Sequence, residues 1–216
     1  MKYVKMLGLA AVAAMALMAF LGAGTASATV LCKEAGKTTG CTNDFVKGQR
    51  IEATTTVGTT AILETTGGVV LDKCTGSKIT GEIEVTGGAE TTVSGPIDPL
   101  NKETGKSGLE WGECSRTTHT LKVGKLEVHH ITNTDNGTLT ATGGIEVTIN
   151  TIFGSCVFGT GEALDVGKLT GGNPATINTE KTVVPKISGN AACPTHGVWN
   201  AQFTLTEPGS AWVSAS

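Results

Sequence analysis

Aromatic side chains are scarce in this sequence, which has 3 Trp, 1 Tyr and 5 Phe among 216 residues. A buried aromatic ring removes a large area from water, so a chain with few rings needs another source of stability. Proline is also rare, with 6 residues, whereas glycine is abundant, with 30. The glycines follow no strict tripeptide repeat, which excludes a collagen-like chain. The scarcity of rings predicts a lean core of Val, Ile and Leu that is supported by covalent cross-links.

A strong charge of either sign is also missing. The formal net charge is −3, from 16 basic and 19 acidic residues. Without residues 1–28, which contain Lys2 and Lys5 and no acid, 14 basic and 19 acidic residues remain, a net charge of −5. Such a balance provides no basic surface for nucleic acid or anionic lipid. We therefore expect no nucleic-acid partner.

The N-terminus has the pattern of a secretory signal peptide. Lys2 and Lys5 precede an unbroken apolar run from Met6 to Leu21, and Ala26-Ser27-Ala28 forms an A-x-A cleavage site. The apolar run is short for a membrane span, which argues against the alternative of an uncleaved anchor. The pattern predicts a signal peptide over residues 1–28, a secreted chain that starts at Thr29, and no stable membrane insertion after cleavage.

All the cysteines follow the predicted cleavage site. They are Cys32, Cys41, Cys74, Cys114, Cys156 and Cys193. An even set in an exported protein predicts disulfides, although six cysteines permit 15 pairings. The most economical pairing joins Cys32 to Cys41 within an N-terminal loop, Cys74 to Cys114, and Cys156 to Cys193.

Threonine and glycine dominate the rest of the chain, which favours many short strands separated by turns. Gly67-Gly68 predicts a tight hairpin, and residues 133–137 form the strongest turn pattern. Ile145, Val147 and Ile149 alternate with polar residues, as do the apolar residues from Trp199 to Leu205, which is typical of half-buried antiparallel strands. We expect an all-β, antiparallel, sandwich-like fold stapled by disulfides. A parallel β-helix is the alternative, but its repeats are shorter and stricter.

Two segments of the chain resemble one another. Thr66-Gly67-Gly68-Val69 and Thr142-Gly143-Gly144-Ile145 each precede a pair of cysteines, separated by 40 and by 37 positions. This similarity predicts an N-terminal disulfide loop over residues 29–48, a β-rich half over 49–132 and a related half over 133–216. Chance similarity within a Thr/Gly-rich chain is an equal alternative, because compositional bias inflates internal matches.

Several short motifs carry a resemblance to a known family. They include Thr29-Val30-Leu31-Cys32-Lys33, Phe153-Gly154-Ser155-Cys156, Val184-Pro185-Lys186-Ile187, and Cys193-Pro194 ahead of Val198-Trp199. With them the chain resembles a family of uncharacterised exported β-rich proteins of soil actinobacteria. The resemblance implies export and a β-rich fold, and it implies no catalytic residues.

Four residues are weak candidates for binding. Glu110 and Glu113 flank Trp111 in an acidic and aromatic cluster of the type that holds a sugar, although Trp111 alternates with Leu109 and is expected in the core. His129 shares a strand face with Glu127, and a hairpin at Gly124 would bring His119 beside them. Three such ligands without a tight motif are weak support for a metal site, so we expect solvated histidines, no metal and no cofactor.

Motifs for a catalytic nucleophile or a phosphate loop are absent from the sequence. We therefore expect a non-enzymatic protein at or outside the cell envelope, which binds a cell-wall polymer, an environmental polymer or another carbohydrate on its Thr-rich strand faces. One alternative is a small secreted hydrolase or metal-dependent enzyme that uses Glu110, Glu113 or the histidines. The other is a structural component of the cell surface or spore coat.

Overall fold

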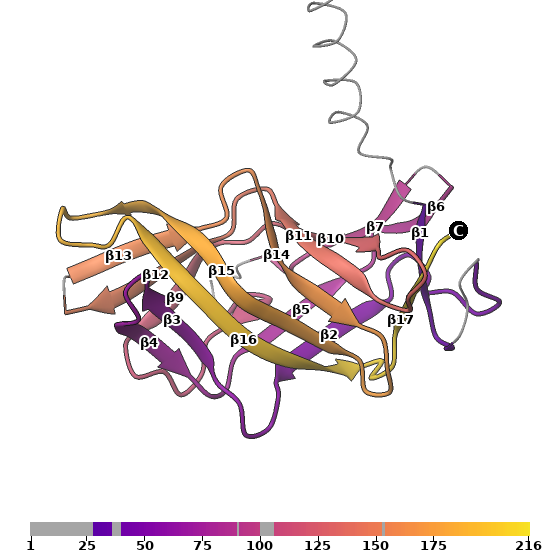
Figure 1. Ribbon diagram of the computed structural model, residues 1–216, viewed down its shortest axis with the longest axis horizontal. Coiled ribbons are helices and arrows are strands. Elements are labelled where there is room, and N and C mark those ends of the chain that lie inside the picture. The colour runs from indigo at the N-terminus through magenta and orange to yellow at the C-terminus, as the bar shows by residue number, and fades with distance from the viewer. Residues whose placement is uncertain (1–27, 36–39, 90, 100–105, 153) are drawn as a thin grey trace, which may run out of the picture.

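The computed structural model describes residues 28–35, 40–89, 91–99, 106–152 and 154–216. All but the last residue of the predicted signal peptide thus lies outside the described residues. Within the described ranges the chain consists of strands and turns, and the pairs of strands are antiparallel (Figure 1). The prediction of an all-β, antiparallel fold with disulfides is confirmed. None of the described segments is a helix long and apolar enough to cross a membrane.

Most strands are short, as the frequent glycine and threonine turns dictate. The first strands are β1 (Thr29–Cys32), β2 (Arg50–Thr55), β3 (Ala61–Thr65), β4 (Val70–Cys74), β5 (Lys78–Glu82), β6 (Val85–Gly88), β7 (Thr91–Pro96) and β8 (Leu109–Glu110). The strands that follow are β9 (Thr118–Lys122), β10 (Lys125–His130), β11 (Gly137–Thr142), β12 (Glu146–Thr151), β13 (Gly154–Gly159), β14 (Ala163–Thr170), β15 (Thr176–Gly189), β16 (His196–Glu207) and β17 (Trp212–Ser214). With 14 and 12 residues, β15 and β16 are long enough to belong to two groups of strands.

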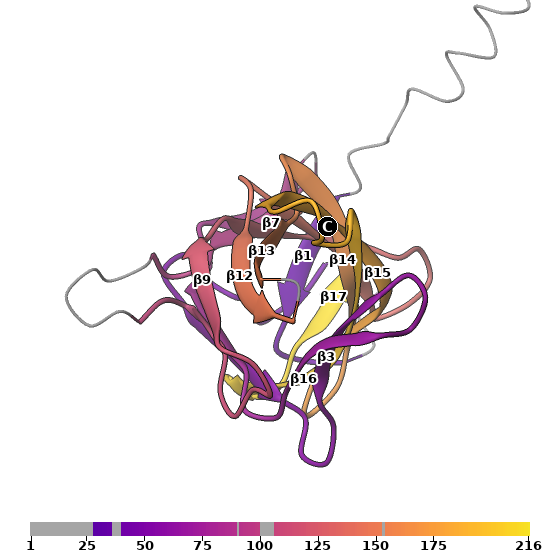
Figure 2. The ribbon, with the colours of Figure 1, turned by 90° about the vertical axis from the view of Figure 1, so that its left-hand side faces the viewer.

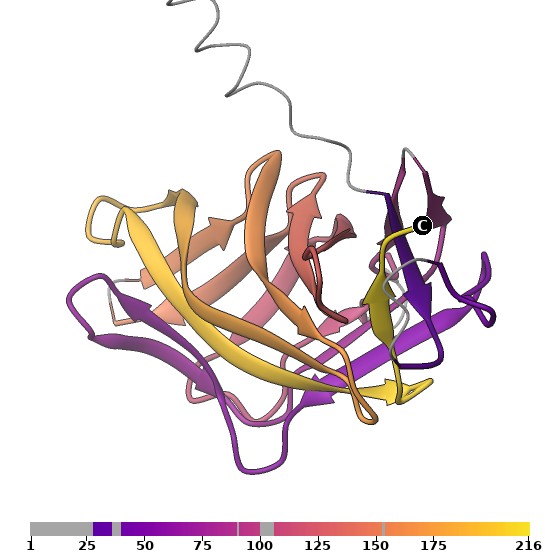
Figure 3. The same ribbon diagram turned by 45° about the vertical axis from the view of Figure 1, so that its right-hand side comes forward.

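The first group of strands surrounds the larger part of the core. Neighbouring strands pair in the order β7, β10, β11, β14, β15, β16, β2 and β5. A bridge between Gly81 and Ile97 then joins β5 back to the segment after β7. At the end of this group β1 pairs with β6 and with β17, so the indigo start and the yellow end of the described chain lie side by side (Figure 3).

The second group of strands surrounds the rest of the core at the opposite end of the molecule. The order is β9, β12, β13, β15, β16, β3 and β4. A bridge between Cys74 and Cys114 joins β4 to the segment that leads into β9. Viewed from this end, the strands surround the interior (Figure 2). Because β15 and β16 run through both groups, the two groups are parts of one hydrogen-bonded sheet.

The interior follows the alternation seen in the sequence. Along β16 the inward residues Ala201, Phe203 and Leu205 are buried, with Phe203 fully so. One core cluster fills the first group and a smaller one, containing Leu63 and Ile149, fills the second. Trp199 packs against both clusters and thereby connects them. The core is built mainly of aliphatic side chains, as the scarcity of rings predicts.

Three disulfides have the economical pairing. They join Cys32 to Cys41, Cys74 to Cys114 and Cys156 to Cys193. The second fixes β4 to the segment before β9, and the third fixes β13 to the connection between β15 and β16. These two bridges tie segments that are distant in the sequence, whereas the Cys32–Cys41 bridge closes a local loop after β1.

The local turns agree with the sequence, but one hairpin does not form. Residues 65–69 connect the paired strands β3 and β4, and the turn after His130 connects the paired strands β10 and β11. A hairpin at Gly124, which would have placed His119 beside His129, does not form, because β9 pairs with β12 while β10 pairs with β7 and β11. The two Thr-Gly-Gly segments also differ, since Gly67 lies in a hairpin whereas Gly143 lies between β11 and β12, which pair with other strands.

Candidate functional site

The outer face of the first group of strands carries rows of polar side chains. Cross-strand partners in an antiparallel sheet point to the same side, so register alone defines a row. The first row crosses β10, β11, β14, β15 and β16 and consists of His129, Thr138, Lys168, Asn178 and Gln202. The second row crosses β14, β15, β16, β2 and β5 and consists of Thr170, Thr176, Thr204, Thr54 and Lys78. We call these two rows the polar outer face.

The polar outer face faces outward because its sequence neighbours point into the core. Leu139, next to Thr138, and Ile177, next to Asn178, are buried. Thr138 and Lys168 are exposed, while Asn178 and Gln202 are half-buried. The face therefore presents hydroxyl, amide and ammonium groups to solvent.

His129 is the only one of the four predicted binding residues within these rows. Its Nε2 lies 3.9 Å from Oε2 of Glu127, which precedes His129 by two residues and so lies on the same face of β10. Oε1 of Glu127 accepts a hydrogen bond of 3.3 Å from Thr142 Oγ1. His119 lies on β9, which pairs with β12 rather than with β10, so the structure does not bring His119 beside His129 and Glu127.

Glu110, Trp111 and Glu113 do not form one cluster of side chains. Glu110 pairs in register with Lys78 and so continues the second polar row. Trp111 points the other way, packs against the core and donates a hydrogen bond of 3.1 Å from Nε1 to Thr120 Oγ1. Glu113 is exposed in the turn before β9 and accepts a hydrogen bond from Thr75. The expected core position of Trp111 is confirmed.

Lys78, in the second polar row, forms an ion pair with Glu52. Nζ of Lys78 lies 2.6 Å from Oε2 of Glu52, and this hydrogen bond lowers the pKa of Glu52. A hydrogen bond from Lys125, at the start of β10, lowers the pKa of Glu84, which lies between β5 and β6, in the same way. Both carboxylates lie on the surface, where such pairs contribute little to stability.

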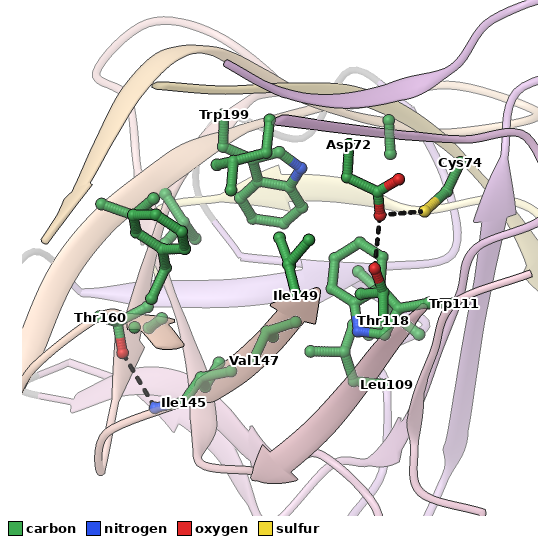
Figure 4. Close-up of a pocket in the computed structure, with 18 of the residues that line it drawn as sticks. Asp72, Cys74, Leu109, Trp111, Thr118, Ile145, Val147, Ile149, Thr160 and Trp199 are labelled. Atoms are coloured by element: carbon green, nitrogen blue, oxygen red, sulfur yellow. Dashed lines mark hydrogen bonds between the residues drawn. The ribbon is translucent and has the colours of Figure 1, made fainter. Parts of the chain in front are cut away.

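Asp72 is a buried carboxylate that the sequence interpretation missed. It is 3% exposed and lies on β4 beside a cavity (Figure 4). Its Oδ1 accepts hydrogen bonds of 2.8 Å from the Lys73 amide, 2.9 Å from Ser115 Oγ and 2.9 Å from the Arg116 amide, and its Oδ2 accepts one from Thr118 Oγ1. One feature of the sequence could have identified it. Asp72 lies between the apolar residue Leu71 and Cys74 in a predicted strand, where a buried charge without partners would be costly.

The same region contains a group of possible metal ligands, namely Asp72, Cys74 and Cys114. Both sulfurs are part of one disulfide, so neither provides the thiolate that a metal would need. Sγ of Cys74 lies 3.4 Å from Oδ2 of Asp72 as a neighbour without a proton to donate. Asp72 therefore acts as an acceptor that fixes the segment 115–118 to β4.

Comparisons with models of known protein families, with curated proteins and with solved structures found no match.

Proposed function

We propose that the mature chain is an exported, non-enzymatic binding protein that holds a cell-wall or environmental polysaccharide against its polar outer face. The observation that carries the proposal is the in-register row of His129, Thr138, Lys168, Asn178 and Gln202. Neighbouring strands lie about 4.8 Å apart, so the row places one polar group at each step along a line. A regular line of this kind suits an extended polymer with repeating polar groups.

The chemistry of the row matches hydroxyl-rich ligands. A threonine hydroxyl both donates and accepts, and the side-chain amides of Asn178 and Gln202 provide two donors and an acceptor each. Lys168 adds a positive charge for an acidic group of a wall polymer. Glu110, in register with Lys78, extends the second row by one strand, which supports a ligand longer than one sugar.

Other features support binding rather than catalysis. Glu110 lies opposite Lys78 in the strand register, Glu113 accepts a hydrogen bond from Thr75, and His129 lies beside Glu127. An acid and base pair needs its two groups to reach one substrate bond. The distribution of these residues over different partners and strands favours a binding role.

Export is supported by the N-terminal sequence together with the cysteines. The apolar run and the Ala26-Ser27-Ala28 site are typical of a signal peptide. Three disulfides, with no free cysteine among the described residues, suit an oxidising compartment.

The proposal is tested by sedimentation with insoluble polymers. The oxidised protein, residues 29–216, is mixed with isolated cell walls, chitin or cellulose, and the pelleted fraction is measured. We expect at least one polymer to pellet the protein, and we expect the triple variant Thr138→Ala, Asn178→Ala, Gln202→Ala to stay in solution. The control variant His196→Ala changes an exposed residue near the opposite end of β16 and is expected to pellet normally.

Two results contradict the proposal. The first is that the protein remains in solution with every polymer. The second is that the triple variant pellets to the same extent as the control variant. Pelleting without any polymer, caused by self-association, would instead favour the structural surface component.

A further inference from the structure

The interior of the second group of strands contains a cavity of about 90 Å³. Strands from both halves of the chain form its wall, which includes Leu63, Trp111, Val147, Ile149, Phe158 and Trp199 (Figure 4). Aliphatic and aromatic carbon forms most of this wall. The cavity is separate from the polar outer face, so a ligand bound inside it is independent of the proposed polymer binding.

The polar groups on the cavity wall already have partners. Asp72 accepts its bonds from residues 73 and 115–118. Oγ1 of Thr160 accepts a hydrogen bond of 3.0 Å from the amide of Ile145. A water molecule needs two to four polar partners to occupy a cavity stably, so this one favours an uncharged apolar occupant.

Two of the three tryptophans of the chain lie on this wall. Trp111 and Trp199 meet edge to face, with their ring centroids 6.1 Å apart. The Nε1 of Trp111 donates a hydrogen bond to Thr120, so the indole contributes carbon atoms to the cavity wall. An empty cavity deprives its lining of dispersion contacts, and a ring inserted between aromatic walls restores them.

We propose that this cavity is a binding site for a small, uncharged, apolar molecule of at most about the size of a single aromatic ring. An engineered apolar cavity of about 150 Å³ stays dry and binds benzene or xenon. The present cavity is smaller, so xenon fits it directly and benzene requires a modest shift of the wall. Ile79 and Ile97 lie between this cavity and a second one of about 90 Å³, and their side chains provide room for such a shift.

Benzene and xenon are the probes, and methyl NMR of the oxidised protein is the measurement. We expect saturable shifts for Leu63, Val147 and Ile149, which line this cavity, with smaller shifts for Leu31 and Val128 at the second cavity. Ala141→Leu fills the first cavity and is expected to weaken benzene binding about tenfold or more. Ala53→Leu is the matched control, because Ala53 is equally buried but lines only the second cavity.

Three outcomes overturn the inference: no saturable shift with either probe, shifts centred on the second cavity, or equal weakening by Ala53→Leu and Ala141→Leu. Urea unfolding of each variant shows whether it is folded. If Ala141→Leu does not fold, Ala61→Leu fills the same cavity from β3 and replaces it in the comparison.

Discussion

Ser115 Oγ donates a hydrogen bond of 2.9 Å to Oδ1 of Asp72, across 43 positions of the sequence. The same oxygen accepts a hydrogen bond from the amide of Arg116. Cys74, two positions after Asp72, forms a disulfide with Cys114. One buried carboxylate and one disulfide therefore hold the same two segments together. This junction joins β4 to the segment that leads into β9, beside the apolar cavity.

Removal of the Asp72 carboxylate is expected to be costly. In Asp72→Ala the donors from Lys73, Ser115, Arg116 and Thr118 lose their common acceptor, which predicts a loss of about 2 to 4 kcal/mol in the free energy of unfolding. Ser115→Ala removes the bond from Ser115 Oγ to Asp72 and the one that this hydroxyl accepts from the Lys73 amide. Because that amide keeps its bond to Asp72, the variant is expected to cost only about 1 kcal/mol. Urea unfolding of both variants is the measurement. Equal losses would contradict the role assigned to Asp72.

The disulfides are expected to differ in their contribution to stability. In the chain-entropy description, the Cys156–Cys193 bridge, with a separation of 37, contributes about 4 kcal/mol, and the Cys32–Cys41 bridge, with a separation of 9, about 2.5 kcal/mol. Double serine variants of each pair are compared by urea unfolding under one set of conditions. A larger loss for the Cys32 and Cys41 pair would contradict this order.

The close approach of β5 and β7 depends on glycine. A Cβ atom added to Gly95 would lie 1.9 Å from the carbonyl oxygen of Glu82, so Gly95→Ala must push the two strands apart. We expect a loss of about 2 to 4 kcal/mol in unfolding free energy. Gly67→Ala is the control, because a Cβ there meets only Thr65 Oγ1, at 3.7 Å. That variant is expected to stay within about 0.5 kcal/mol of the parent, and a similar loss in both would contradict the packing argument.

The Glu52 and Lys78 pair predicts a small acid dependence of stability. The hydrogen bond from Lys78 lowers the pKa of Glu52 below its ordinary value of 4.5, so the unfolded chain binds the proton more readily than the folded one. Stability from this pair is present above pH 4.5 and is lost as the pH falls through the lowered pKa. Lys78→Met should therefore reduce the fall in unfolding free energy on acidification. An unchanged acid dependence in a pH series of urea unfolding curves would contradict the assignment.

The buried hydroxyl of Ser77 has no hydrogen-bond partner among the described residues. A buried polar group without a partner lowers stability. Ser77→Ala is therefore expected to leave the free energy of unfolding unchanged or to raise it by up to about 1 kcal/mol. Thermal unfolding measures the change, and a clear loss would show that the hydroxyl has a partner in solution.

The local features of this fold were predictable from the sequence, and the distant ones were not. The Gly67-Gly68 turn and the alternation around Ile149 depend on neighbours along the chain, and both agree with the structure. The partner of β9 depends on which distant strand covers its edge, so the sequence around Gly124 could not show whether the two strands that flank it pair with each other.

The candidate sites show the same division. The face on which Trp111 lies follows from its alternation with Leu109. The polar outer face required the register of several strands, because its residues come from positions as distant as Thr54 and Thr204. The cavity required packing in three dimensions, and the role of Asp72 required the approach of residues 115–118 to β4.

Three bridges between specific cysteines hold this sparse core together, and we propose that they form after export of the chain. The decisive measurement is mass spectrometry of the unreduced protein, recovered from the medium of a host that exports the full chain. We expect a chain that starts at Thr29 and peptides that join Cys32 to Cys41, Cys74 to Cys114 and Cys156 to Cys193. Free thiols, other partners, or a retained N-terminal segment would contradict it.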